Sequence, residues 1–124
     1  MGIHLNQALG VHPQALELRV ERSKVLASNL ANETTPGYQA RDLDFKAALQ
    51  HEMSTAQAGS LGDLGGEQPD LLYRLPNQPS IDGNTVELGV EQAAFAQNAA
   101  DFQMGLTFLT AKFKGLNMAI NGNG

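Results

Sequence analysis

The chain has 124 residues, a formal net charge of −5 at pH 7 and no cysteine. This length supports at most one domain, the acidic balance argues against nucleic acid as a partner, and the lack of cysteine excludes disulfide scaffolds and cysteine-rich metal sites. The sequence contains no run of about 18 apolar residues, so we expect no transmembrane helix. The N-terminus carries no Lys or Arg and no continuous apolar core, so we also expect no cleavable secretory signal.

The first predicted element is a helix over about residues 14–32. Apolar and small residues recur on one stripe at helical spacing, with a mixed-charge face between them. Pro13 is expected either to open this helix or to kink it. The stripe consists of Leu5, Leu9, Leu16, Val20, Ser23, Ala27 and Leu30.

A turn and an extended arm follow the first helix. Asn29 and Asn32 are expected to end the helix. The sequence Thr-Pro-Gly at 35–37 prevents its continuation, because proline fixes φ and glycine accommodates a positive φ. The segment 38–45 is predicted to be extended, and a short helix is predicted over about 44–57.

The middle of the chain has the poorest core-forming sequence. Residues 54–66 are rich in Gly, Ala, Ser and Gln, so we predict a weakly ordered linker. A short extended segment over 71–75 and a proline-rich turn follow. Acidic residues heavily outnumber the lone Arg74 between His51 and Glu91, which indicates a surface region.

The C-terminal segment from Asn84 to Ile120 has an apolar repeat of seven residues. This 4-3 alternation, kept over about five heptads without a proline, is typical of a long coiled-coil helix about 55 Å in length. Asn84 and Glu87 match a capping box at its start. The two registers are Leu88, Phe95, Phe102, Leu109 and Leu116, and Gln92, Ala99, Leu106, Phe113 and Ile120.

A further apolar stripe lies on a different face of the same helix, at Met104, Phe108, Ala111, Gly115 and Met118. A helix that is apolar on two sides must be buried on two sides, and one antiparallel partner cannot cover both. We therefore expect other copies of the chain, or other proteins, to cover it. The residues assigned to packing between subunits are Leu16, Val20, Leu30, Leu88, Phe95, Phe102, Met104, Leu106, Phe108, Leu109, Phe113, Leu116 and Ile120.

Three glycines inside the long helix have two interpretations. Gly89, Gly105 and Gly115 would each weaken the helix by about 1 kcal/mol relative to alanine. They would also allow a neighbouring helix to approach closely. Both interpretations remain open at this point.

The sequence thus predicts a mostly α fold. Two long terminal helices form a coiled-coil-like pair that packs between subunits, together with an extended arm, a short helix and a weakly ordered middle segment. The expected parts are an N-terminal helical segment (1–36), an arm, short helix and linker (37–83), and a C-terminal long helix (84–124). Both termini together would form one discontinuous structural domain.

Catalytic and metal-binding chemistry finds little support. Asp42 and Asp44 could share a face of the arm, but a paired-carboxylate site needs a cleft, so we favour ion pairs or hydrogen bonds to a neighbouring subunit. His4, His12 and His51 lack the spacing of a metal site. We therefore predict no catalytic residue, no metal and no cofactor.

The stretch LASNLANETTPGYQARDLDF resembles the N-terminal signature of the flagellar axial proteins, the rod, hook and hook-associated family. The stretches DLLYRLPNQPSIDGNTVELGVEQAAFAQNA and FQMGLTFLTAKFKGLNMAI, with the lack of a large central insert, narrow the resemblance to proximal rod proteins of the bacterial flagellar basal body. It covers nearly the whole chain apart from about 54–66. The residues of the turn motif are Asn29, Leu30, Ala31, Asn32, Thr35, Pro36, Gly37 and Tyr38.

The resemblance implies a non-enzymatic subunit that serves motility. Such proteins are exported unfolded by the flagellar type III apparatus with an uncleaved N-terminal signal. They assemble in the periplasmic rod with copies of themselves, other rod proteins, the membrane ring and its adaptor FliE, and their terminal helices surround the export channel. Phe45 and Leu49 match a short hydrophobic motif for the export gate, which is a common pattern. Pro13 departs from the family, whose first helix commonly lacks a proline there.

Two alternatives belong to other functional classes. A small peptidoglycan-acting enzyme would use Asp42 or Asp44 as an acid. A helical export chaperone would remain inside the cell, whereas a rod subunit would co-purify with basal bodies.

Overall fold

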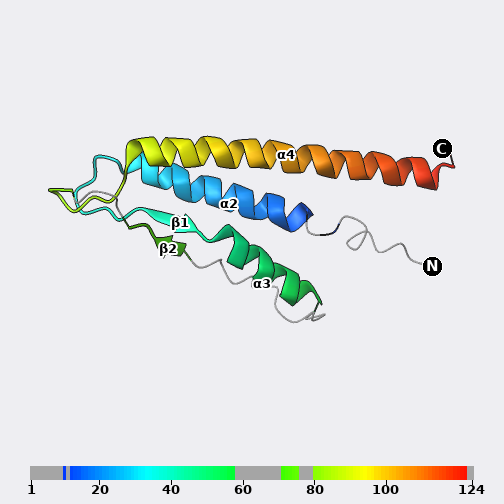
Figure 1. Ribbon diagram of the computed structural model, residues 1–124, viewed down its shortest axis with the longest axis horizontal. Helices are drawn as coiled ribbons and strands as arrows, with labels where there is room; N and C mark the ends of the chain where they lie inside the picture. The colour runs from blue at the N-terminus through cyan, green and yellow to red at the C-terminus, as the bar shows by residue number, and fades with distance from the viewer. Residues whose placement is uncertain (1–9, 11, 58–70, 76–79, 123–124) are drawn as a thin grey trace.

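The computed structural model describes residues 10, 12–57, 71–75 and 80–122. Helices dominate this part of the chain, as the sequence predicts (Figure 1). In chain order the elements are α2 (His12–Ala31), β1 (Arg41–Leu43), α3 (Phe45–Gln57), β2 (Leu71–Tyr73) and α4 (Leu88–Ile120).

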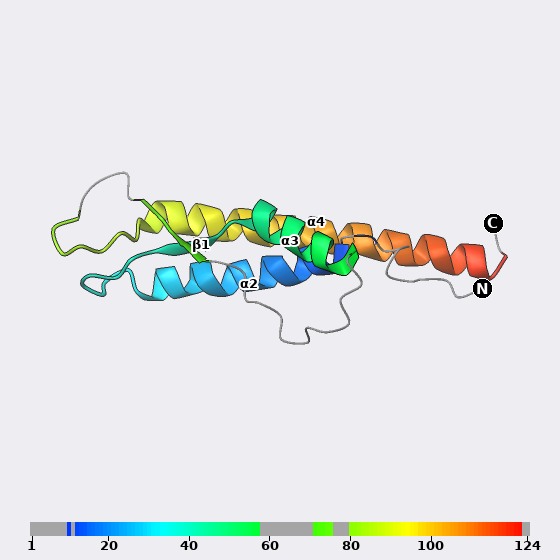
Figure 2. The ribbon, with the colours of Figure 1, turned by 90° about the horizontal axis from the view of Figure 1, so that it is seen from below.

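The two long helices, α2 and α4, lie side by side and run in opposite directions, and α4 extends beyond the start of α2 (Figure 1). β1 and α3 contact the other side of α2, and β2 pairs with β1. In the view from below, α2 and α4 again run side by side (Figure 2). Because α2 is the middle layer, it has to offer one face to α4 and another to β1 and α3.

Pro13 opens α2. The helix begins at His12, so Pro13 is its second residue, where a backbone N–H has no partner within the helix in any case. The predicted stripe is only partly correct. Val20 is 42% exposed, whereas Leu18 and Leu26 are buried, because α2 packs on two sides rather than one. Leu5 and Leu9 of that stripe lie outside the described residues.

The predicted start of the long helix at Asn84 is wrong. α4 begins at Leu88, and Glu87 takes the N-cap position with extended backbone angles. Asn84 is buried, and its side-chain Nδ2 donates to backbone carbonyls in the turn just after α2. Its Oδ1 accepts the N–H of Val86 over 2.8 Å, which lies before α4, so Asn84 shapes the turn and the helix starts four residues later.

The short middle elements match their predictions closely. Asp44 caps α3, because its Oδ1 accepts the N–H of Ala47 over 3.1 Å. Residues 54–57, assigned by the sequence to both the short helix and the linker, belong to α3, and residues 58–66 lie outside the described residues. β1 and β2 pair antiparallel, with Arg41 opposite Tyr73.

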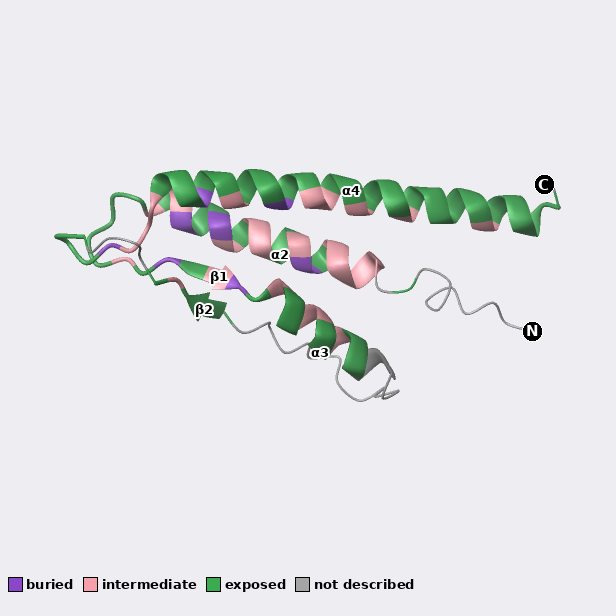
Figure 3. Ribbon diagram, in the orientation of Figure 1, coloured by how far each residue is buried: buried purple, intermediate pink, exposed green. Residues whose placement is uncertain are grey.

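The core is small and half of it is polar (Figure 3). Its buried apolar residues are Leu18, Leu26, Ala40 and Leu43, and its buried polar residues are Asn29, Asn84, Glu91 and Asn98. Such a core depends on specific hydrogen bonds as well as on apolar burial. Within the described residues, no helix combines the length and apolar character needed to cross a bilayer.

Candidate functional site

The turn after α2 is organised by Asn29, which is fully buried. Its Nδ2 donates to the backbone carbonyl of Arg41 over 2.6 Å and to Oε2 of Glu91 over 2.9 Å. Its Oδ1 accepts the N–H of Arg41 over 3.1 Å and the hydroxyl of Tyr38 over 3.4 Å. One side chain therefore connects the end of α2, the arm and the start of α4.

Asn84 makes the second connection between the turn and α4. Its Nδ2 donates to the carbonyls of Asn32, Glu33 and Thr35 over 3.0, 2.8 and 2.8 Å. These carbonyls lie in the turn directly after α2, so Asn84 holds this turn against the segment that leads into α4. Asn32 itself donates to the carbonyl of Ser28 over 2.7 Å, which supports the predicted helix end.

The remaining motif residues shape the chain direction. Gly37 has a positive φ of 74°, and its N–H donates to the carbonyl of Asp82 over 2.9 Å. Tyr38 is half-buried, and its hydroxyl lies 3.1 Å from Oγ of Ser28. Leu30 is also half-buried, whereas the other two motif residues, Ala31 and Pro36, are exposed.

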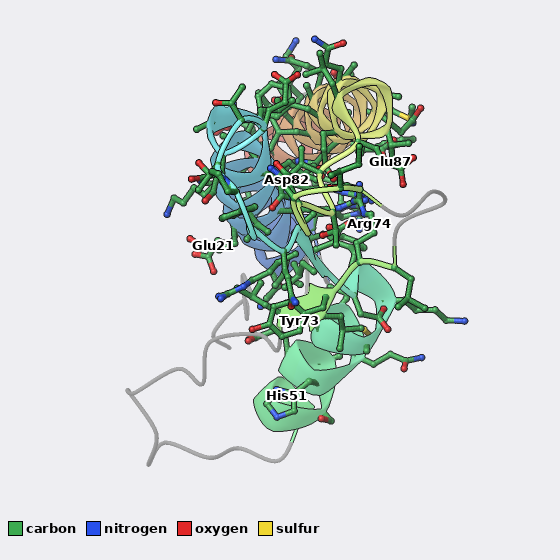
Figure 4. All side chains as sticks on the ribbon, turned by 90° about the vertical axis from the view of Figure 1, so that its left-hand side faces the viewer. Glu21, His51, Tyr73, Arg74, Asp82 and Glu87 are labelled. Carbon is green, nitrogen blue, oxygen red and sulfur yellow. The ribbon has the colours of Figure 1, made fainter. Side chains whose placement is uncertain are left out.

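A chain of alternating charges joins four elements. Asp42 in β1 accepts from Arg22 in α2 over 2.9 Å and from Arg74 over 2.6 Å. Arg74, directly after β2, also donates to Oε1 of Glu91 in α4 over 2.5 Å, and Glu91 is fully buried. In Figure 4, Arg74 lies directly below α4, whereas Tyr73 lies further away beside α3.

The charges in this chain shift two pKa values in opposite directions. Burial alone would raise the pKa of Asp42, but hydrogen bonds and charge from Arg22, with a further hydrogen bond from Arg74, lower it below its usual range. The hydrogen bond from Asp42 raises the pKa of Arg22. Both shifts favour the charged forms, so the ion pair persists over a wide pH range.

The sequence prediction missed this network. The stretch between His51 and Glu91 was expected at the surface, yet the side chain of Arg74 is only 17% exposed and that of Glu91 is 0% exposed. Asp42 was expected to bond to a neighbouring subunit, but its partners lie within the chain. The available signal was the isolation of Arg74 among acidic residues, since a lone cation there has few alternative partners.

The buried residues of α4 are polar rather than apolar. Glu91, Asn98 and Gly105, spaced by seven, form what we call the inner seam. Glu91 and Asn98 are fully buried. A Cβ at Gly105 would lie 3.0 Å from Cδ2 of Leu16, so this glycine allows the close helix approach left open above. A Cβ at Gly89 or Gly115 would meet no neighbouring element within 4 Å.

The exposed large apolar side chains of α4 lie beside the inner seam and not on it. At 3.6 residues per turn they form two stripes that flank the seam, a near stripe close to it and a far stripe further round the helix on the other side. The near stripe is Leu88 (40% exposed), Phe95 (38%), Leu106 (42%), Phe113 (46%) and Ile120 (67%). The far stripe is Val90 (38% exposed), Met104 (58%), Phe108 (59%) and Met118 (55%).

Other predicted packing residues are partly covered. Phe102, Leu109 and Leu116 are half-buried, as is Leu16. The far stripe contacts α2 at the N-terminal end of that helix, where the rings of Phe108 and His12 stack with centroids 6.3 Å apart.

The proposed export motif, Phe45 and Leu49, lies on α3. Both residues are half-buried. The guanidinium of Arg19 lies 3.6 Å from the centroid of the Phe45 ring. Burial is the main cause that lowers the pKa of Arg19, and the nearby charge of Asp101 counteracts it.

Within the described residues, no group of three or more His, Asp or Glu side chains is placed to hold a metal ion. Asp42 and Asp44 also have separate partners: two guanidinium groups for the first and the start of α3 for the second. The geometry is therefore that of a polar clamp at one end of a helix pair, with exposed apolar stripes along it.

No protein-family model matches the chain. It is 40% identical over 132 residues to "Flagellar basal body rod protein FlgB" of Salmonella typhimurium, covering 95% of this chain and 96% of that protein. It is 40% identical over 134 residues to the protein of that name from Escherichia coli, covering 96% and 97% of the two chains. With the protein of that name from Cereibacter sphaeroides the identity is 45% over 120 residues, covering 92% and 94%. The chain therefore belongs to the FlgB family of flagellar basal body rod proteins.

Proposed function

We propose that this chain is a structural subunit of the flagellar basal-body rod and that the near and far stripes of α4 pack against neighbouring subunits. The observation that carries this proposal is the division of α4 into a polar seam occupied by α2 and two apolar stripes left exposed. The curated relatives are named as rod proteins, which supports the same role.

The energy of the exposed stripes supports association. Nine large apolar side chains of α4 are between 38% and 67% exposed. Fully burying such a side chain is worth about 1.5–3 kcal/mol, so covering both stripes would contribute on the order of 10 kcal/mol gross. A helix with this pattern gains most of that energy only in an assembly.

The turn motif is proposed to set the direction of the arm relative to the helix pair. Asn29 and Asn84 tie the turn to both helices, which supports treating 1–36 and 84–124 as one discontinuous domain. The arm that leaves this turn carries β1 and α3, which pack on α2. Subunit contacts made by the arm would depend on this fixed direction.

Location and export are further parts of the proposal. The resemblance supports export by the flagellar type III apparatus without a cleaved signal, and assembly in the periplasmic part of the rod beside FliE, the membrane ring and other rod proteins. Phe45 is half-buried beneath Arg19, so an export gate would read Phe45 and Leu49 only in an unfolded chain. Replacing both with alanine should reduce secretion, while normal secretion of that variant would remove the motif from the proposal.

The packing role is tested by three neighbouring substitutions in α4. Leu106→Asp and Phe108→Asp place a charge in the near and far stripes, and Thr107→Asp places it between them. Thr107 is exposed and its hydroxyl bonds only to the carbonyl of Gln103 in its own helix, so it is the matched control. All three purified proteins should keep their helical circular dichroism.

In cells, the first two variants should be absent from purified basal bodies and should abolish swimming, and Thr107→Asp should do neither. Normal incorporation of both stripe variants would contradict the packing role. Stripe variants found in the culture supernatant would have been exported but not assembled, whereas variants missing from it would have failed in export.

We propose a structural role in place of the enzyme and chaperone alternatives. Asp42 and Asp44 already serve an ion-pair network and a helix cap, which supports a structural use of both carboxylates. Peptidoglycan hydrolysis by the pure protein, abolished by alanine at both positions, would favour the enzyme. Retention of the native protein in the cytoplasm would favour the chaperone.

A further inference from the structure

We infer that the inner seam sets the register in which α4 pairs with α2 and reserves this face of α4 for the chain's own α2. The seam residues Glu91, Asn98 and Gly105 lie on one line along α4, because seven residues are close to two helical turns.

Asn98 is the central member and is fully buried. Its Nδ2 donates to the carbonyl of Arg19 over 2.8 Å and to Oγ of Ser23 over 2.7 Å. Its Oδ1 accepts from the guanidinium of Arg19 over 3.4 Å. All of these partners lie on one turn of α2, so a longitudinal shift of the helices would leave a buried amide without partners.

The two outer members repeat the constraint. Oε2 of Glu91 accepts from Asn29 over 2.9 Å, and Gly105 admits Leu16, whose Cδ2 would lie 3.0 Å from an added Cβ. The contacted residues of α2 are Asn29, Ser23 and Leu16, in the order of the seam. Each step of seven residues along α4 therefore corresponds to a step of six or seven residues backward along α2. In this one antiparallel register the Glu91 carboxylate and the Asn98 amide both have hydrogen-bond partners, and Leu16 fits against Gly105.

Apolar packing cannot fix this register. One register of α4 has a large apolar residue at every seventh position, so a shift of one heptad again aligns large apolar side chains along it. This register is Leu88, Phe95, Phe102, Leu109 and Leu116. A polar residue in such a repeat specifies register and partner at a cost in stability. If the rod function proposed above holds, this reservation leaves the two stripes as the surfaces available to neighbouring subunits.

The absence of cysteine makes the register directly measurable in the full chain. His12→Cys with Phe108→Cys reports the native register, because the two rings lie 6.3 Å apart. His12→Cys with Gly115→Cys reports a shift of one heptad. A short bismaleimide reagent, followed by peptide mass mapping, counts the intramolecular cross-link in each pair.

With Asn98 present, only the native-register pair should cross-link efficiently. Asn98→Leu should raise the shifted cross-link at least several-fold. Asn98→Ala removes the amide without adding volume, and it should give the same direction of change if leucine disrupts folding. Gln92→Leu adds an identical side chain at an exposed position of α4 and should keep the native register.

The inference is overturned if neither Asn98 variant gives more shifted product than Gln92→Leu. It is also overturned if the native pair fails to cross-link in the presence of Asn98. Both readouts use the isolated chain, so they stand apart from incorporation into basal bodies. A chain with the native register that still fails to assemble would therefore contradict the proposed function and leave this inference intact.

Discussion

The side chains of Asn29 and Glu91 meet across the helix pair, 62 positions apart in sequence, with both residues fully buried and 2.9 Å between Nδ2 and Oε2. Asn29 belongs to the turn motif, and Glu91 belongs to the first turn of α4. The contact therefore links the most recognisable stretch of the sequence to the helix that carries the exposed apolar stripes.

Asn29→Asp should destabilise the fold strongly. The change replaces an amide donor with a second carboxylate next to Glu91 in a buried site, at a cost of about 3 kcal/mol. Urea unfolding followed by circular dichroism measures it. Repulsion should raise the folded-state pKa of the new carboxyl, so its penalty applies above the unfolded pKa and should shrink as the pH falls. Asn117→Asp, on the exposed side of α4, should be nearly neutral.

Arg74→Met should also cost about 3 kcal/mol, because it leaves Glu91 buried without its guanidinium partner. The expected result is a lower urea midpoint and loss of hydrogen-exchange protection in β1 and β2. Arg41→Met is the comparison, since Arg41 is exposed and lies 5.2 Å from the Tyr73 ring centroid. Equal effects of the two substitutions would argue against the charge network.

Stability should fall in acid partly through Asp42. The folded state lowers the pKa of this carboxyl, since the partners Arg22 and Arg74 outweigh its burial, so the unfolded state binds more protons. Its contribution is complete above the unfolded pKa of about 3.9 and is lost as the pH falls through the lower folded pKa. Urea midpoints should therefore drop below about pH 4, and less steeply in Asp42→Asn.

A second carboxyl serves as the control for that experiment. A hydrogen bond from Ser80, followed by one from the backbone of Asn84, lowers the pKa of Asp82, which is fully exposed. Asp82→Asn should change the acid profile less than Asp42→Asn does, because solvent screens an exposed group. A larger change in Asp82→Asn than in Asp42→Asn would show that the loss of stability in acid arises in the loop before α4.

Asn84→Asp should loosen the turn motif. A carboxylate oxygen in place of Nδ2 would face the carbonyls of Asn32, Glu33 and Thr35, so donors would be replaced by repulsion at a cost of about 2 kcal/mol. Hydrogen exchange should accelerate in residues 32–38 before it does in the middle of α4. Asn121→Asp, exposed at the other end of α4, should leave that exchange unchanged.

The sequence alone determined the helices, the break between α2 and the arm, and the excess of apolar surface on α4. These features follow from local rules: proline and glycine chemistry after Asn32, and a seven-residue repeat from Leu88 to Ile120. The same residues carried the resemblance to the flagellar axial proteins. A periodic pattern shows where the apolar residues lie, and this was enough for the fold class.

Only the tertiary structure decided which face of α4 meets α2 and what Asn84, Arg74 and Glu91 do. Asn84 matched a helix cap locally, yet it bonds to carbonyls about 50 positions earlier in the chain. Hydrogen bonds and ion pairs of this kind depend on which distant groups the fold brings within about 3 Å, and spacing along the chain carries no record of that. Apolar attraction has no direction, so it can select two helices without selecting the seam along which they touch.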